Sequence, residues 1–146
     1  MMPACRTYVA VSALIGLSAC GTASSSPLDS FNHAHCVAAF YYGRQIALGG
    51  PKPNLELAVQ STARFLFEGK RMKADGTLQT SEMESAAVLS AHGRDTEAMT
   101  HLLLDCARRQ DADPAYRALN ETGKLMAAAR KTDPACKSDR VCGMMR

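Results

Sequence analysis

Apolar side chains recur at every third or fourth position in five segments of the chain, which is the spacing of an amphipathic helix. No segment alternates apolar and polar residues with the period of two that a half-buried strand needs. The pattern therefore predicts an all-α fold, a single small bundle of about five helices. The expected helices start after Asp29 or Ser30, Asn54, Ser81, Asp95 and Asp113, and they end near Leu48, Asp75, Gly93, Gln110 and Arg130.

Two of these helix starts carry a distinctive signature. Ser81 is followed three positions later by Glu84, the arrangement of a capping box in which each side chain bonds the other residue's backbone N–H. Asp113 is followed by Pro114, and proline is favoured at the first helical position because its missing N–H needs no partner there. We expect the third helix to begin at Ser81 and the fifth to run from Asp113 to about Arg130.

The N-terminal segment has a different pattern. A single positive charge, Arg6, precedes an uncharged, mostly apolar run from Tyr8 to Ala19. This run is shorter than the roughly 20 residues that a membrane-spanning helix needs. The layout is typical of a secretory signal peptide, which we expect to cover residues 1–19.

This segment ends in an aliphatic residue, two small residues and a cysteine. Leu17, Ser18, Ala19 and Cys20 resemble the lipobox of bacterial lipoproteins. The resemblance implies that the Cys20 thiol is joined to diacylglycerol and that cleavage before Cys20 makes it the first residue of the mature chain. With a further acyl chain such as palmitate on the new amino group, the protein would be held stably on a membrane.

The residues after the cysteine bear on where the anchor lies. Gly21 occupies the position where lipoproteins kept at the inner membrane of Gram-negative bacteria usually carry Asp. The resemblance therefore implies an outer-membrane anchor that faces the periplasm of a Gram-negative cell. Residues 20–29 are mostly small and polar, so we expect a lipidated N-terminus and a flexible tether there, followed by a helical domain over residues 30–146.

Four further cysteines belong to the expected mature chain. An even number of cysteines in an exported protein indicates disulfides, and four cysteines allow three ways of forming two bridges. We favour the pairing in which Cys36 and Cys106 join the first helix to the fourth, while Cys136 and Cys142 close the C-terminal tail.

The charge of the chain bears on its partners. Once residues 1–19 are removed with Arg6, 16 Lys and Arg remain against 14 Asp and Glu. The basic residues are scattered, whereas binding to nucleic-acid phosphates depends on clustered Lys and Arg. We therefore expect the membrane, through the anchor at Cys20, and a protein as partners, and no nucleic acid.

One short stretch contains residue types that bind metals, namely His33, His35 and Cys36. On a helix His33 and Cys36 share a face, but His35 points away from it, so at most two of the three can meet one ion. Zinc normally takes four ligands, or three and a water molecule. We therefore expect no metal site and no cofactor.

A polar stripe follows one face of the expected fourth helix. Glu97, His101 and Asp105 are spaced by four residues, and a carboxylate beside an imidazole can make a general base. Such stripes are more often solvent-exposed faces with pairs between residues four apart. No serine lies in a G-x-S-x-G nucleophile elbow, so we expect no enzyme.

These features favour one function and leave two alternatives. We expect a membrane-anchored periplasmic lipoprotein that acts as a binding or structural module for an envelope component or a protein. One alternative is an inhibitor or immunity-type protein against an envelope-acting toxin or hydrolase. The other is a periplasmic enzyme or metal-binding protein that uses His101, or His33 and His35.

Tyr41 and Tyr42 are adjacent on a helix and cannot share one buried face, so one of them is expected to mark a contact surface.

Overall fold

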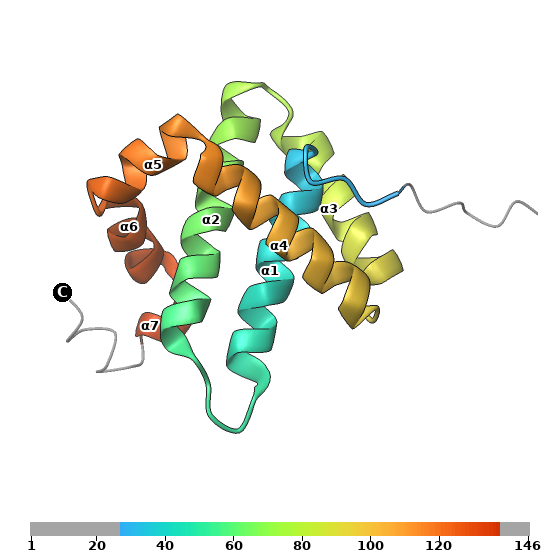
Figure 1. Ribbon diagram of the computed structural model, residues 1–146, viewed down its shortest axis with the longest axis horizontal. Helices are drawn as coiled ribbons and strands as arrows, with labels where there is room; N and C mark the ends of the chain where they lie inside the picture. Colours follow the sequence, from blue (N-terminus) through green and yellow to red (C-terminus); the bar gives the residue numbers. More distant parts are fainter. Residues whose placement is uncertain (1–26, 138–146) are drawn as a thin grey trace, which may run out of the picture.

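Two antiparallel helices, α1 (His33–Gly49) and α2 (Leu55–Ala74), form the centre of the structure, a computed structural model that describes residues 27–137. α3 (Leu78–His92) and α4 (Thr96–Ala112) pack against α1, and α4 crosses the hairpin diagonally (Figure 1). On the other side, α5 (Pro114–Glu121) leads into α6 (Lys124–Thr132), which packs against α2. α7 (Pro134–Lys137) is a single turn. The described part contains no strand, which confirms the all-α prediction.

Three helix starts lie where their capping residues predict them. The side chains of Asn54, Asp95 and Asp113 accept hydrogen bonds from backbone N–H groups in the first turns of α2, α4 and α5. α1 differs, because its cap is Asn32 and neither Asp29 nor Ser30. The Asn32 side chain accepts from the N–H of Ala34 at 2.9 Å, whereas Asp29 accepts from the N–H of Phe31, ahead of the helix.

The prediction of a capping box at Ser81 is wrong. α3 begins at Leu78, directly after the turn at Gly76, whose φ of 71° is a conformation that glycine adopts without strain. Ser81 is therefore inside the helix, and its N–H donates to the carbonyl of Thr77 at 2.9 Å. The turn at Gly76 is enough to reverse the chain, so the helix starts before the capping signal.

The expected fifth helix is in fact two helices. Gly123 has a φ of 66°, which ends α5 and turns the chain back towards α2. Because of this turn, the described residues form six helices of eight or more residues and the short α7, instead of about five. The break allows Tyr116 of α5 and Leu125 of α6 to be buried against α2, which one straight helix would not do.

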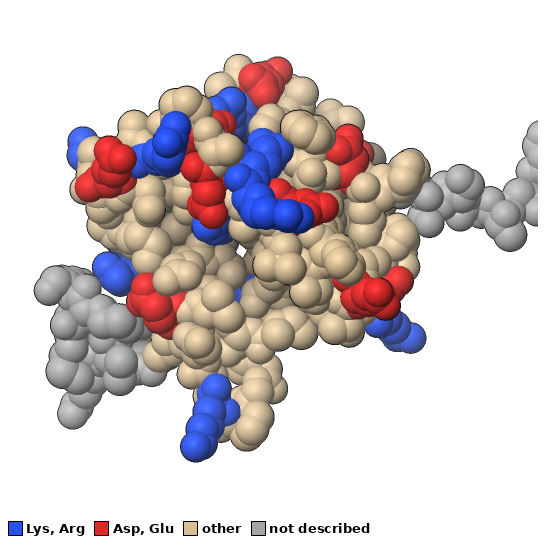
Figure 2. Space-filling model, in the orientation of Figure 1, with Lys and Arg blue, Asp and Glu red and all other residues tan. Residues whose placement is uncertain are grey.

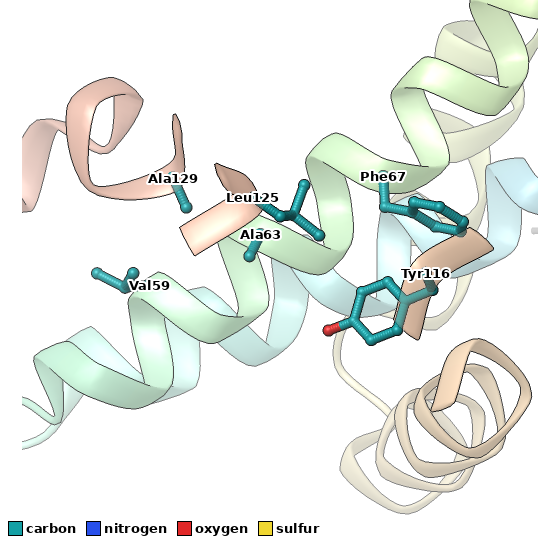
Figure 3. Close-up of a cluster of buried hydrophobic side chains, with 6 residues drawn as sticks. All are labelled: Val59, Ala63, Phe67, Tyr116, Leu125 and Ala129. Carbon is teal, nitrogen blue, oxygen red and sulfur yellow. The ribbon is translucent and has the colours of Figure 1, made fainter. Parts of the chain in front are cut away.

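The core lies on both sides of the central hairpin. On one side, α2 contributes Val59, Ala63 and Phe67 to a cluster with α5 and α6, and the rings of Phe67 and Tyr116 meet edge to face at 5.2 Å (Figure 3). On the other side, α1 packs Ala39 and Phe40 against α4 and packs Ala38 and Tyr42 against α3 and α4.

α1 and α4 pack closely at Gly43. A Cβ atom at this position would lie 3.0 Å from Cδ2 of Leu103, so a larger residue would require the Leu103 side chain to shift. The two helices are also joined covalently. Cys36 and Cys106 form a disulfide with a Cα–Cα distance of 5.6 Å, which confirms the predicted pairing.

Several sequence-based predictions fall outside the described residues. The signal peptide, Cys20 and Cys142 are among the residues whose structure is not described, so the described part shows one disulfide and the Cys136–Cys142 bridge stays a prediction. None of the described helices is long and apolar enough to cross a membrane.

Candidate functional site

A groove of about 310 Å³ lies between α1, α2 and the junction of α6 and α7. Its walls are almost wholly apolar. They are formed mainly by Phe40, Tyr41, Phe65, Leu66 and Pro134. A concave apolar surface of this size is typical of a ligand site, although it lies at the small end of the usual range.

The charged groups of the groove are paired with each other. Nε and Nη2 of Arg44 donate to the two carboxylate oxygens of Asp133 at 2.8 and 2.7 Å. The hydroxyl of Thr62 donates to the same carboxylate at 2.7 Å, and Asp133 is only 1% exposed. The hydrogen bond to Asp133 raises the pKa of Arg44, so the guanidinium stays charged. Among the described residues that line the groove, the two opposite charges of this pair therefore balance each other.

Tyr41 and Tyr42 divide as expected between surface and core. Tyr42 is 9% exposed and packs against Val88 and Met99, whereas Tyr41 is 44% exposed and lies along the groove. The exposed tyrosine is thus part of the site.

A second polar cluster is buried between α1, α2 and α4. Glu68 is fully buried, and its carboxylate contacts the side chains of His33 and Arg109 and accepts from Nε2 of Gln110 at 2.7 Å. Arg109 also lies 3.5 Å from the sulfur of Cys36. These contacts satisfy the carboxylate and tie three helices together beside the disulfide.

The candidate metal ligands are directed to different partners. His33 faces Glu68, and Cys36 is in the disulfide. Nδ1 of His35 accepts from the N–H of Asp29 at 2.9 Å, while Nε2 lies 3.2 Å from Glu84. Within residues 27–137, no group of three or more His, Cys, Asp or Glu side chains could hold a metal ion.

The polar stripe on α4 faces solvent. Glu97 and His101 are exposed, and Asp105 is paired with Arg108 on the same helix. A hollow beside the stripe is lined by His101 and Asp105 together with Leu28 and Phe31. The arrangement is that of a solvated helix face, and the structure does not bring the three side chains into a catalytic constellation.

The surface carries no large field of one sign on the face shown in Figure 2. Lys and Arg side chains alternate there with Asp and Glu, and the region near the α1–α2 turn is mostly uncharged. This face therefore has no concentration of like charges that could steer a strongly charged partner towards it.

No model of a known protein family matches the chain, and neither a curated protein nor a solved structure is significantly similar to it. The geometry of the groove is therefore the basis for a functional proposal. Sequence reasoning missed Arg44 and Thr62, which carry no local signal. It could have noted Asp133, because Asp133-Pro134 repeats the cap pattern of Asp113-Pro114.

Proposed function

We propose that the chain is a lipid-anchored binding module of the bacterial cell envelope. In this proposal the helical domain takes up an apolar group of another envelope component in the groove between α1, α2 and the α6–α7 junction. The observation that carries the proposal is the groove itself, because its walls are mostly apolar and the two charged residues among its described lining residues are paired with each other.

The walls of the groove are held in place by contacts between the helices, which favours binding. α1 and α2 are joined as a hairpin, and the Arg44–Asp133 pair fastens the α6–α7 junction to α1. Thr62 fastens the same junction to α2. A site whose walls are already fixed loses little conformational entropy on binding, so more of the contact energy remains as affinity.

The lipobox resemblance at Cys20 supports the location. A tether from Cys20 to Leu28 covers eight peptide units and spans at most about 27 Å. The domain would therefore stay close to the membrane surface, where lipids and other anchored proteins are concentrated. The second disulfide, Cys136–Cys142, is part of the same proposal, because it requires an oxidising compartment.

Binding of Nile red, an uncharged apolar dye, tests the groove. The protein is residues 20–146 with Cys20→Ser, which contains every described residue and needs no detergent. Thr132 lies exposed at the edge of the groove, so Thr132→Trp would fill it and weaken dye binding by about tenfold.

Met83→Trp is the matched control, because Met83 is 71% exposed on α3 and lies outside the groove. This variant should bind the dye as the parent does. Absence of dye binding by the parent protein, or equal binding by the two tryptophan variants, would contradict the proposal.

A further inference from the structure

We infer that the apolar group taken up in the groove is one ester-linked acyl chain of an envelope lipid. The inference rests on the proposed function, since it names the ligand of the same site. Three properties of the groove select this ligand: its backbone, its charges and its volume.

The backbone of α1 and α2, which forms most of the groove, offers no hydrogen bond to a ligand. The walls on α1 and α2 are helical, so their N–H and C=O groups are bonded within each helix. The non-helical residue at the junction is also satisfied, because the N–H of Asp133 donates to Ala129 at 2.8 Å and its carbonyl accepts from Cys136 at 3.1 Å. An extended peptide in the groove would bury its own backbone groups without partners, which is costly. An acyl chain has no such groups.

The side chains exclude a charged group from the inside of the groove. Two N–H groups of Arg44 already donate to the Asp133 carboxylate. The Thr62 hydroxyl is hydrogen-bonded to Asp133 and to the carbonyl of Ala58. A free fatty acid would bring a carboxylate next to a guanidinium whose charge Asp133 already neutralises. An acyl ester is neutral and meets no such penalty, so the charges favour a lipid ester over a free acid.

The volume fits a chain of medium length. A cavity of 310 Å³ holds about ten methylene groups, if each is taken as comparable to the ~30 Å³ of a water molecule in the liquid. A single apolar side chain from a partner helix would leave much of this space empty. The ester of such a chain would lie beside the Arg44–Asp133 pair in the groove wall, and only the head group beyond the ester would lie outside.

Titration with methyl esters of straight-chain acids from six to twelve carbons tests the inference, read by NMR on labelled residues 20–146 with Cys20→Ser. Affinity should rise about fourfold with each methylene and level off near ten carbons. The signals of Tyr41, Phe65 and Leu66 should shift, whereas that of Met83 should not. Methyl decanoate should bind more tightly than decanoate, and Thr132→Trp should abolish binding while Met83→Trp leaves it intact.

The failures of the two proposals are distinguishable. Affinity that is independent of chain length, or tighter binding of decanoate than of its methyl ester, would overturn the assignment to a lipid ester. If a leucine-rich helical peptide displaces Nile red and methyl decanoate does not, the groove is a binding site but its ligand is a protein, so this inference fails alone. If neither displaces the dye, or no dye binds, both proposals fail.

Discussion

Arg44 and Asp133 are 89 positions apart in the chain, and they form an ion pair with two hydrogen bonds that joins α1 to the turn between α6 and α7. Thr62 adds a third hydrogen bond from α2 to the same carboxylate. The pair thus holds together three segments that form the groove. It neutralises the charge of the groove and also fixes its shape.

Removal of the Asp133 carboxylate should be strongly destabilising. Asp133→Ala leaves the largely buried Arg44 without its counter-charge, and losses of about 3–5 kcal/mol are typical when one partner of a buried pair is removed. Urea unfolding would measure the loss. Asp111→Ala is the control, because the Arg64–Asp111 pair is exposed on its acidic side and should be worth less than about 1 kcal/mol. Equal losses in the two variants would contradict a buried structural pair.

Loss of the Cys36–Cys106 disulfide should also lower the free energy of unfolding. The bridge spans 70 residues and lies in the core, so the double substitution Cys36→Ala and Cys106→Ala should cost about 2–5 kcal/mol. Non-reducing peptide mapping of the parent protein, with all its cysteines in place, would test the Cys136–Cys142 bridge. A peptide that links Cys136 to a cysteine other than Cys142 would exclude it.

The stability of the domain should fall at alkaline pH. Burial raises the pKa of the Tyr116 phenol above its usual value near 10, with Arg64 opposing the shift. The unfolded chain therefore loses the proton first, and stability that is present below pH 10 decreases as the pH rises further. Tyr116→Phe should reduce this dependence in unfolding experiments between pH 9 and about 11. A pH dependence in Tyr116→Phe as steep as that of the parent protein would contradict the assignment to Tyr116.

The solvated stripe on α4 should tolerate substitution. His101→Ala removes an exposed side chain from a helix and should change the free energy of unfolding by less than about 0.5 kcal/mol. Thermal and urea unfolding would both report the difference. A loss of more than about 1 kcal/mol would show that His101 makes a contact that the stripe geometry does not account for.

Replacement of Cys20 tests the anchor. In a Gram-negative host, Cys20→Ser should abolish incorporation of radiolabelled palmitate and leave an unprocessed or unanchored chain, because the acylated thiol is the proposed attachment point. Ser18→Ala, which keeps a small residue in the lipobox, should preserve labelling. Palmitate in the Cys20→Ser protein would contradict lipidation at this residue.

The sequence by itself determined the all-helical class and several of the helix starts, because helix formation depends on neighbours three and four positions away. Asn54, Asp95 and Asp113 cap their helices as predicted, since a cap needs only its own side chain and the next turn. Cys36 and Cys106 could be paired from the sequence, since each continues an apolar face and few partners were available.

Only the tertiary structure decided which of several local signals prevailed and which distant polar groups met. The capping pattern at Ser81 and the continuous apolar spacing after Pro114 were both locally acceptable. In the fold, the turn at Gly76 starts α3 earlier and α3 packs Val88 against α1, whereas the turn at Gly123 brings Leu125 of α6 against α2. The partners of Glu68 and Asp133 lie on other helices, so the periodic pattern of the sequence does not predict these contacts. The groove is formed where α1, α2 and the α6–α7 junction pack together. Its shape depends on the distances between these segments, and the sequence of one segment does not fix those distances.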